Sequence, residues 1–283
     1  MTTSPVIDAH QHVGAPPALH EAGTASTGTA SSPDAGWAAD VSVRLDAMDR
    51  LGIDQTLLLP ANGYLRPRGA QDTAAVNDGL SRFAALSERF LAKVGVAEPL
   101  DGPASLTELD RLRDNGFAGV SFHTRFQGVA IEHPWVARLV AHMRELRLIP
   151  FVHVYEDSTM ESVLMLGELA ERFADLPFIA LDAAGSLAHL RQAQTAARHA
   201  DNILFEVSMT PGPFLRRLAD HVGPSRLVFG TDGYLDSGRL LVSSNFPAVL
   251  RHFFDHEESD AILGGNISRA LRWAAAPAGP WPG

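Results

Sequence analysis

Short apolar runs alternate with longer stretches of helical periodicity through nearly the whole chain. The runs are bounded by polar, Gly or Pro residues, which is typical of buried strands in a parallel sheet. The strands are expected at Val6–Ala9, Gln55–Pro60, Leu91–Ala97, Ala118–His123, Ile149–Val154, Phe178–Asp182, Ile203–Val207 and Arg226–Gly230.

Between these runs, apolar residues recur on one face of a helix. In VSVRLDAMDRLGI, residues 41–53, Val41, Leu45 and Met48 fall on one face, and Gly52 is a stop signal. The same spacing occurs in HPWVARLVAHMRELRL (133–148), SVLMLGELAERF (162–173) and PGPFLRRLADHV (211–222).

Eight strands separated by helices imply parallel strands joined by right-handed crossovers. A single-domain, closed (β/α)8 TIM barrel over residues 1–283 fits this count and length best, and an open doubly wound sheet is the alternative. Two segments interrupt the rhythm. Residues 14–40 are rich in Ala, Gly, Ser and Thr and predict an insertion, either flexible or a lid, and residues 274–283 predict a loose tail or a packed strap.

Composition narrows the class of protein. Hydrophobic residues make up 46% of the chain, enough for a large core, and the net charge of −10 argues against nucleic-acid or anionic membrane partners. The absence of cysteine excludes disulfides and thiolate chemistry. The N-terminal MTTSPVIDAH lacks a signal-peptide pattern and no apolar run is long enough to span a bilayer, so a cytoplasmic protein is expected.

Candidate chemistry is concentrated where the predicted strands end. In a parallel barrel the functional face lies at the carboxyl ends of the strands. His10 and His12, in VIDAHQHVG, are two residues apart and point the same way from a strand. His153 ends the fifth strand, and Asp232 follows the eighth.

Each of these residues has an ordinary structural interpretation when taken alone. His-x-His pairs arise by chance, His153 fits a core histidine, and Asp232 in Gly-Thr-Asp-Gly fits a turn. Their common position at strand ends favours one site instead. Imidazoles with a carboxylate suit zinc, or manganese, iron or cobalt, and such an ion lowers the pKa of water to about 7. A carboxylate such as Asp232 then accepts the proton of that water.

Three further residues are candidates for the same mouth. His123 ends the fourth strand and is expected to line the site and assist catalysis. Arg125, just beyond it, is a candidate partner for a substrate carboxylate, and Tyr155 is a candidate hydrogen-bond donor to substrate. Histidines on predicted helices, His189 among them, are expected to be surface or packing residues.

The motifs VIDAHQHVG, LDAMDRLGIDQTLLLP, GFAGVSFHT, LIPFVHV, RLVFGTDG and ILGGNISRAL together resemble the amidohydrolase superfamily, in its amidohydrolase 2 branch. The resemblance covers nearly the whole chain and implies a distorted (β/α)8 barrel. It also implies one metal ion held by His10, His12, His153 and Asp232. Members hydrolyse amide, ester or lactone bonds, some decarboxylate aromatic or unsaturated acids, and many form homodimers or larger assemblies.

The chain departs from that family pattern at two positions. The bridging lysine of two-metal members is missing, because Lys93 is the only lysine and lies on the third strand. Ala183, in Asp182-Ala183-Ala184-Gly185, stands where a histidine is expected after the sixth strand. A divergent chemistry, an inactivating change, or replacement in space by His123 would each account for Ala183.

Three functional hypotheses follow from the sequence. The first is a metal-dependent hydrolase of a small, carboxylate-bearing amide, ester or lactone, with zinc or manganese as cofactor and Asp232 as general base and acid. The second is a non-oxidative decarboxylase at the same mononuclear site. The third is a metal-free or inactive barrel that acts as a binding protein, suggested by Ala183.

Overall fold

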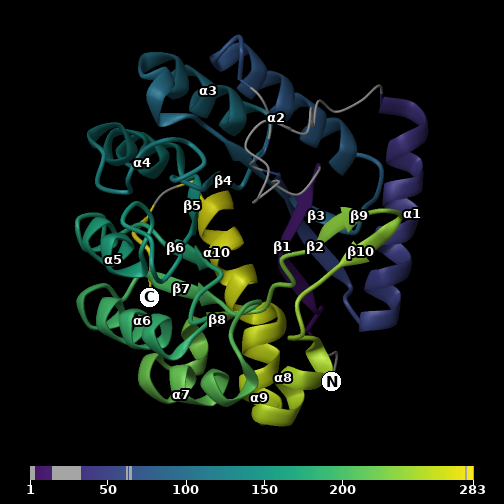
Figure 1. Cartoon of the computed structure of the whole chain (residues 1–283), viewed down its shortest axis with the longest axis vertical. Coiled ribbons are helices and arrows are strands. Elements are labelled where there is room, and N and C mark those ends of the chain that lie inside the picture. The colour runs from purple at the N-terminus through teal and green to yellow at the C-terminus, as the bar shows by residue number, and fades with distance from the viewer. Residues whose placement is uncertain (1–3, 15–32, 62, 64–65, 278, 283) are drawn as a thin grey trace.

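The computed structural model describes residues 4–14, 33–61, 63, 66–277 and 279–282. Eight parallel strands, β1 to β8, follow one another in chain order around a nearly closed barrel (Figure 1). The (β/α)8 fold predicted from the sequence is confirmed, and the open-sheet alternative is wrong. The strands are β1 (Ile7–Val13), β2 (Gln55–Pro60), β3 (Phe90–Val96), β4 (Gly119–Phe122), β5 (Ile149–His153), β6 (Phe178–Leu181), β7 (Ile203–Glu206) and β8 (Leu227–Val228).

Helices surround the barrel, and a short antiparallel hairpin, β9 (Tyr234–Asp236) and β10 (Arg239–Leu241), follows β8. The α-helices are α1 (Pro33–Leu51), α2 (Ala70–Ala84), α3 (Pro103–Asp114), α4 (Pro134–Leu146), α5 (Val163–Glu171), α6 (Leu187–His199), α7 (Gly212–Val222), α8 (Pro247–Phe253), α9 (His256–Asp260) and α10 (Asn266–Ala275). Short 3-10 segments span Pro99–Asp101 and Pro224–Arg226, and a π-helical turn spans Ala261–Gly265. None of the described helices combines the length and apolar character that crossing a bilayer requires.

The strand boundaries differ from the sequence pattern mainly at β1 and β8. β1 continues past the apolar run to Val13, because its polar residues pair with β2 as far as Pro60. β8 ends at Val228, two residues before the predicted end, because the amide of Phe229 donates to the carbonyl of Ile262 at 3.0 Å. The ladder to β7 therefore stops early.

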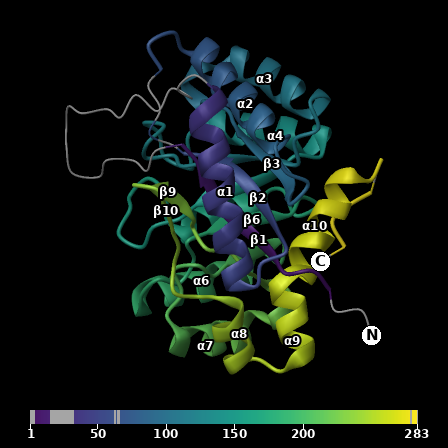
Figure 2. The same ribbon diagram turned by 90° about the vertical axis from the view of Figure 1, so that its right-hand side faces the viewer.

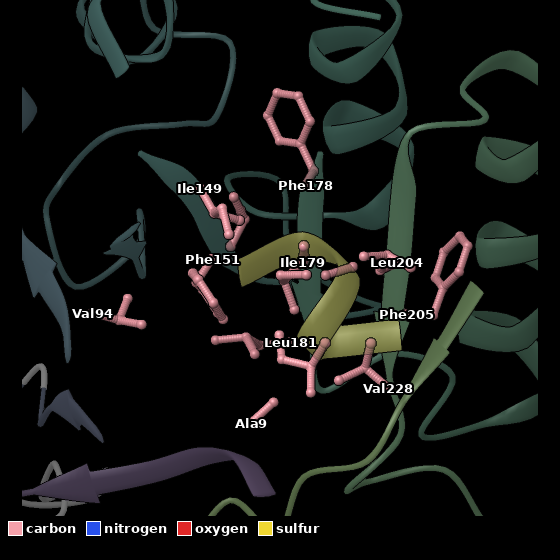
Figure 3. Packing of buried hydrophobic residues seen from close by; sticks show 14 of the residues in the cluster. Ala9, Val94, Ile149, Phe151, Phe178, Ile179, Leu181, Leu204, Phe205 and Val228 are labelled. Atoms are coloured by element: carbon pink, nitrogen blue, oxygen red, sulfur yellow. The ribbon is translucent and has the colours of Figure 1, made fainter. Parts of the chain in front are cut away.

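The barrel core follows from side-chain alternation along the strands. Figure 3 shows Ile179 and Leu204 pointing into the barrel, whereas Phe178 and Phe205 point outwards to the surrounding helices. All four side chains are buried. Strands that are buried on both faces are mostly apolar, which is why they appear in the sequence as nearly continuous apolar runs.

Asp8 connects β1 to the segment that follows β8. One carboxylate oxygen accepts the backbone N–H groups of His10 at 3.0 Å and Thr231 at 2.9 Å. The other accepts the Thr231 hydroxyl at 2.6 Å and the Gln11 side-chain amide at 2.7 Å. Burial raises the pKa of Asp8 to about 6, so the carboxylate is ionised at pH 7 and all four donors have an acceptor.

Helix α1 fixes the outer side of β1. Its Arg44 is fully buried and donates to the side chain of Gln11 and the carbonyl of His12, both at 3.0 Å, while its Nε donates to Asp40 at 3.1 Å. Helix α1 begins at Pro33, so the last part of the predicted insertion, 33–40, is helical rather than irregular. The lid or flexible-loop hypothesis for the rest of that insertion falls on residues 15–32, outside the described part of the chain.

The barrel has a structural end and an open end. Figure 2 shows α10 on the side of the barrel opposite to the β9–β10 hairpin. On the side of α10, a Cβ at Gly264 would lie 2.1 Å from the carbonyl oxygen of Pro5, so the π-helical turn can pack against Pro5 only if residue 264 is glycine. The C-terminal segment packs against the barrel: Trp281 is buried, and its backbone N–H donates to the backbone carbonyl of Asp175 at 3.0 Å.

Replacing Asp8 by Asn is expected to lower the free energy of unfolding by about 2–3 kcal/mol, because one acceptor oxygen becomes an NH2 group facing two donors. Urea denaturation at pH 7 measures the change. The matched control is Asp46→Asn, at an exposed position of α1. Equal stabilities of the two variants would contradict this account of barrel closure.

Candidate functional site

Three histidines meet at the carboxyl ends of β1 and β5. His10 and His12 lie within β1, and His153 is the last residue of β5. One ring nitrogen from each lies within 4.8 Å of the others, and the Nε2 atoms of His10 and His12 are 2.9 Å apart. All three side chains are buried. The alternation of β1 therefore places both of its histidines on the same inner side.

The remaining ring nitrogen of each histidine contacts an oxygen acceptor. Nδ1 of His10 lies 3.0 Å from Glu206 Oε2, Nδ1 of His12 lies 3.1 Å from the carbonyl of Pro60, and Nδ1 of His153 lies 3.0 Å from the carbonyl of Phe122. An acceptor at Nδ1 keeps the proton of a neutral imidazole there and leaves a lone pair on Nε2. Nε2 of His153 is buried without a hydrogen-bond partner in the described part of the chain.

Asp232, which follows β8, completes this group. Its Oδ1 lies 3.5 Å from His10 Nε2 and 3.4 Å from His12 Nε2. Burial by itself would raise the pKa of this carboxyl, but the charge of His10 and the contact with His12 hold it below its ordinary value. Asp232 is therefore an ionised carboxylate beside two imidazoles.

A second carboxylate enters the site from β6. Asp182 lies 3.9 Å from His10 Nδ1, and one atom each of His10, Asp182 and Asp232 lies within 4.8 Å of the others. Burial, and then the neighbouring charge of Asp232, raise the pKa of Asp182 well above its ordinary value. The two aspartates therefore differ: one favours the proton and the other favours the charge.

The backbone around these aspartates is strained. Asp182, Ala184 and Asp232 have φ angles of 63°, 61° and 49°, in the left-handed region that costs non-glycine residues roughly 1–3 kcal/mol each. Gly230, two residues before Asp232, has no room for a side chain, since a Cβ there would lie 2.5 Å from Glu206 Oε1. Strain of this kind is characteristic of functional sites, because there side-chain placement overrides backbone preference.

The protonation of the histidines depends on their neighbours. Burial lowers the pKa of His10, but the charges of Asp232 and Glu206 outweigh it and raise the pKa to about 10. Burial lowers the pKa of His12, and it lowers that of His153 well below the ordinary value. Two of the three imidazoles are thus neutral at pH 7, the form that binds a metal ion.

His123 and Arg125 lie together in the same pocket, held by a buried glutamate. Nδ1 of His123 lies 2.8 Å from Glu161 Oε2, and its ring stacks on His153 with centroids 4.5 Å apart. Arg125 forms an ion pair with Glu161 Oε1 at 2.9 Å, and its guanidinium lies 4.7 Å from the ring centroid of Tyr155. Of the residues singled out in the sequence, His123, Arg125, His153, Tyr155 and Asp232 therefore line one pocket. His10 and His12 are fully buried and contact Asp232.

The pocket has a volume of about 430 Å³ and combines apolar rings with polar groups. Tyr155 is 52% exposed at its mouth, and Tyr234 from β9 stacks on His12 with centroids 4.3 Å apart. The lining residues not yet placed are Phe126, Val154, Glu156, Gly185, Ser186, His189 and Met209.

Sequence reasoning missed several of these residues. Glu161 and Glu206 carry no motif, because one lies in a loop and the other ends a strand with no metal-ligand spacing. In Asp182-Ala183-Ala184-Gly185 the missing histidine at Ala183 is the more conspicuous feature, whereas the residue that lines the pocket is the strand-end acid Asp182. The expectation that His189 is a surface or packing residue is wrong in part: it is buried and lines the pocket.

Ala183 is not among the residues that line the pocket. Its side chain is fully buried, and its carbonyl oxygen accepts the hydroxyl of Thr210 at 2.5 Å. The neighbouring Asp182 lines the pocket instead. His123, whose replacement of that histidine in space is one of the three explanations for Ala183, follows β4 and stacks on His153.

Comparisons with known proteins identify the family and the fold of the chain. The model of the amidohydrolase family matches residues 7–273, and no curated protein matches the chain. Among solved structures, a putative amidohydrolase from Staphylococcus aureus has a TM-score of 0.71 and 14% identity, over 95% of this chain and 99% of that one. The 4-oxalomesaconate hydratase of Rhodopseudomonas palustris has a TM-score of 0.68 and 18% identity, covering 95% and 96%.

A third similar structure is a dihydroxybenzoic acid decarboxylase from Polaromonas sp. JS666 with bound manganese and the inhibitor 2-nitroresorcinol. It has a TM-score of 0.67 and 13% identity, over 96% of this chain and 98% of that one. The TM-scores of these three structures establish a shared fold, and the family match extends over nearly the whole barrel. The chain is an enzyme that belongs to the amidohydrolase family.

Proposed function

We propose that this enzyme is a metal-dependent hydrolase that cleaves an amide, ester or lactone bond in a small, carboxylate-bearing substrate. The observation that carries the proposal is the convergence of His10, His12 and His153 beside Asp232, two of which, His153 and Asp232, line the pocket. The family's description as amidohydrolases supports hydrolysis as the first reaction to test.

The donor set fits one divalent ion. Three imidazoles with Nδ1 tied to oxygen acceptors direct Nε2 to a common point, and the buried Nε2 of His153 has no other partner among the described residues. Such a set with one carboxylate suits zinc, and manganese equally, as in the similar decarboxylase that contains it. When bound, the ion would polarise a carbonyl and lower the pKa of water to about 7.

Asp232 manages the proton in this proposal. Its Oδ1 faces His10 and His12, which leaves Oδ2 to accept a proton from the attacking water and return it to the leaving group. Its pKa, held below the ordinary value, keeps it ionised and able to accept that proton at pH 7. Asp232 thus serves as general base and then as general acid.

Arg125 orients the substrate. Glu161 holds its Nε, and the ring of Phe126 lies 5.0 Å from the guanidinium. None of the hydrogen bonds recorded among the described residues uses its terminal nitrogens, so they are available to a carboxylate in a two-pronged fork. Tyr155 at the mouth fixes the guanidinium from a second side, and His123 lines the pocket next to His153.

Non-oxidative decarboxylation is the second candidate, and a second carboxylate favours it. The reaction replaces a carboxyl group on carbon with hydrogen and therefore needs an acid near that carbon. Asp182 supplies such a group beside Asp232. Decarboxylases of aromatic acids are among the proteins of similar fold.

Replacing His10 and His12 together by Ala is expected to abolish metal binding and turnover, because two of the four donors are removed. Elemental mass spectrometry of protein purified without chelator or affinity metal should find about one zinc or manganese per wild-type chain. The control variant His252→Ala/His256→Ala changes two exposed histidines. Wild-type protein that binds no ion after loading would refute the proposed function.

Release of acid separates hydrolysis from decarboxylation. The ion-loaded enzyme is expected to release a new acid from a carboxylate-bearing ester or lactone, followed by a pH indicator, or a new amine from an amide, followed by an amine-reactive dye, in each case without carbon dioxide. Carbon dioxide released from an aromatic or unsaturated acid, lost in Asp182→Asn, would replace the first candidate with the second.

Glu206→Gln is expected to weaken metal binding about 10- to 100-fold, because the charged acceptor that orients His10 is lost. Competition with a chromophoric chelator measures the affinity. Glu171→Gln, at an exposed position of α5, is the matched control. An unchanged affinity in Glu206→Gln would show that His10 needs no such support.

Arg125→Met is expected to raise KM about 10- to 100-fold and change kcat little, because it removes a charge-assisted fork distant from the reacting bond. Steady-state kinetics on the hydrolysed substrate provide the test, with exposed Arg191→Met on α6 as control. A fall in kcat at unchanged KM would place Arg125 in the chemical step instead.

A further inference from the structure

One wall of the pocket carries polar groups that the proposed reaction does not use. It is formed by the first turn of α6 and by the loop that follows β5, through Ser186, His189 and Glu156. We call these three residues the α6 wall. Its two titratable side chains, His189 and Glu156, have no part in holding the ion or positioning Arg125 in the arrangement described above.

His189 presents a fixed hydrogen-bond donor. Its side chain is 3% exposed, and its Nδ1 accepts the backbone N–H of Gly185 at 3.3 Å. Burial lowers the pKa of His189 to about 4, so the ring is neutral at pH 7 and its proton lies on Nε2. That Nε2 is buried without a hydrogen-bond partner among the described residues.

An unsatisfied buried donor costs a folded protein about 1–3 kcal/mol. Its retention in a pocket wall is explained if a ligand completes the bond.

Glu156 presents an acceptor in the same wall. Its Oε2 is buried and likewise lacks a hydrogen-bond partner in the described residues. Gln192, one turn after His189 on α6, donates from Nε2 to the backbone carbonyl of Glu156 at 3.1 Å. One helix therefore carries the donor and also holds the backbone of the acceptor.

The pairing of a neutral donor with a carboxylate selects the ligand. A substrate carboxylate would accept from His189 but would be repelled by Glu156. An ammonium group would donate to Glu156 but has no lone pair for His189. A hydroxyl group accepts one hydrogen bond and donates another, so it is a substrate group that satisfies both residues.

We propose that the α6 wall is a subsite for a hydroxyl group of the substrate, bound by His189 Nε2–H and by Glu156 Oε2. The inference rests on the proposed function, which assigns the carboxylate of the substrate to Arg125. The rings of Phe126, Tyr155 and Tyr234 line the same pocket, so the body of the substrate is apolar. The enzyme thus takes a hydroxylated acid with an apolar body.

Titration calorimetry with matched acids tests the subsite. The probes are benzoate against 4-hydroxybenzoate and 3-phenylpropanoate against 3-(4-hydroxyphenyl)propanoate, which differ in reach. The ion-loaded wild-type enzyme is expected to bind the hydroxylated member of at least one pair about 10- to 100-fold more tightly. Equal affinities within both pairs, or no binding of any probe, would overturn the subsite.

Variants connect the preference to the wall. His189→Ala is expected to bring the affinity ratio close to one and to leave metal content and the affinity for the unhydroxylated acid unchanged. His189→Gln retains an N–H donor and should restore part of the ratio. His199→Ala, at the exposed end of the same helix, should keep the full ratio. A ratio unchanged in His189→Ala would also overturn the proposal.

Glu156→Ala provides a second, independent variant if His189→Ala does not fold, as judged by thermal denaturation, and it too should abolish the ratio. The same titrations on metal-free protein separate the two proposals, because Arg125 and the α6 wall need no ion. A hydroxyl preference in protein that binds no metal leaves the subsite standing and removes the proposed function. Metal binding and turnover without the preference do the reverse.

Discussion

The buried carboxylate of Asp8 is the contact on which the site depends. It accepts hydrogen bonds from the backbone of His10 and from the backbone and hydroxyl of Thr231, residues at opposite ends of the chain. The same contact that closes the barrel between β1 and the end of β8 therefore sets His10 opposite Asp232. Backbone hydrogen bonds join the same two strand ends, from Ala9 to Phe229 at 3.0 Å and from His12 to Gly233 at 2.7 Å, and Asp8 adds a side-chain contact to them. Barrel closure and site assembly thus use the same set of contacts.

Two buried glutamates extend this order outwards. Glu206 fixes the ring of His10 and also accepts the backbone N–H of Asp182 at 3.1 Å. Glu161 holds His123 and Arg125. Each carboxylate is surrounded by donors, which offsets the cost of burying its charge. The arrangement explains how a pocket with several acids stays folded: most of the acids hold basic groups in place.

The sequence predicted the barrel because strands buried on both faces are unbroken apolar runs and amphipathic helices keep their period. It also predicted His10, His12 and Asp232 as neighbours, since strand ends of a parallel barrel share one face. It did not indicate Glu206 or His189. A carboxylate at a strand end and a histidine in a helix look like ordinary polar positions, and their contacts come from elements far apart in the chain.

The sequence by itself determined which elements form and which end of the barrel carries the chemistry, because both follow from local periodicity and strand direction. Only the tertiary structure decided which polar side chains are orphaned. His153 and His189 are both histidines beside apolar residues in the sequence, yet each has one ring nitrogen held and the other buried without a partner among the described residues. Which ring nitrogen is left without a partner depends on burial by neighbouring elements, and an unsatisfied atom exists only once the chain has folded around it.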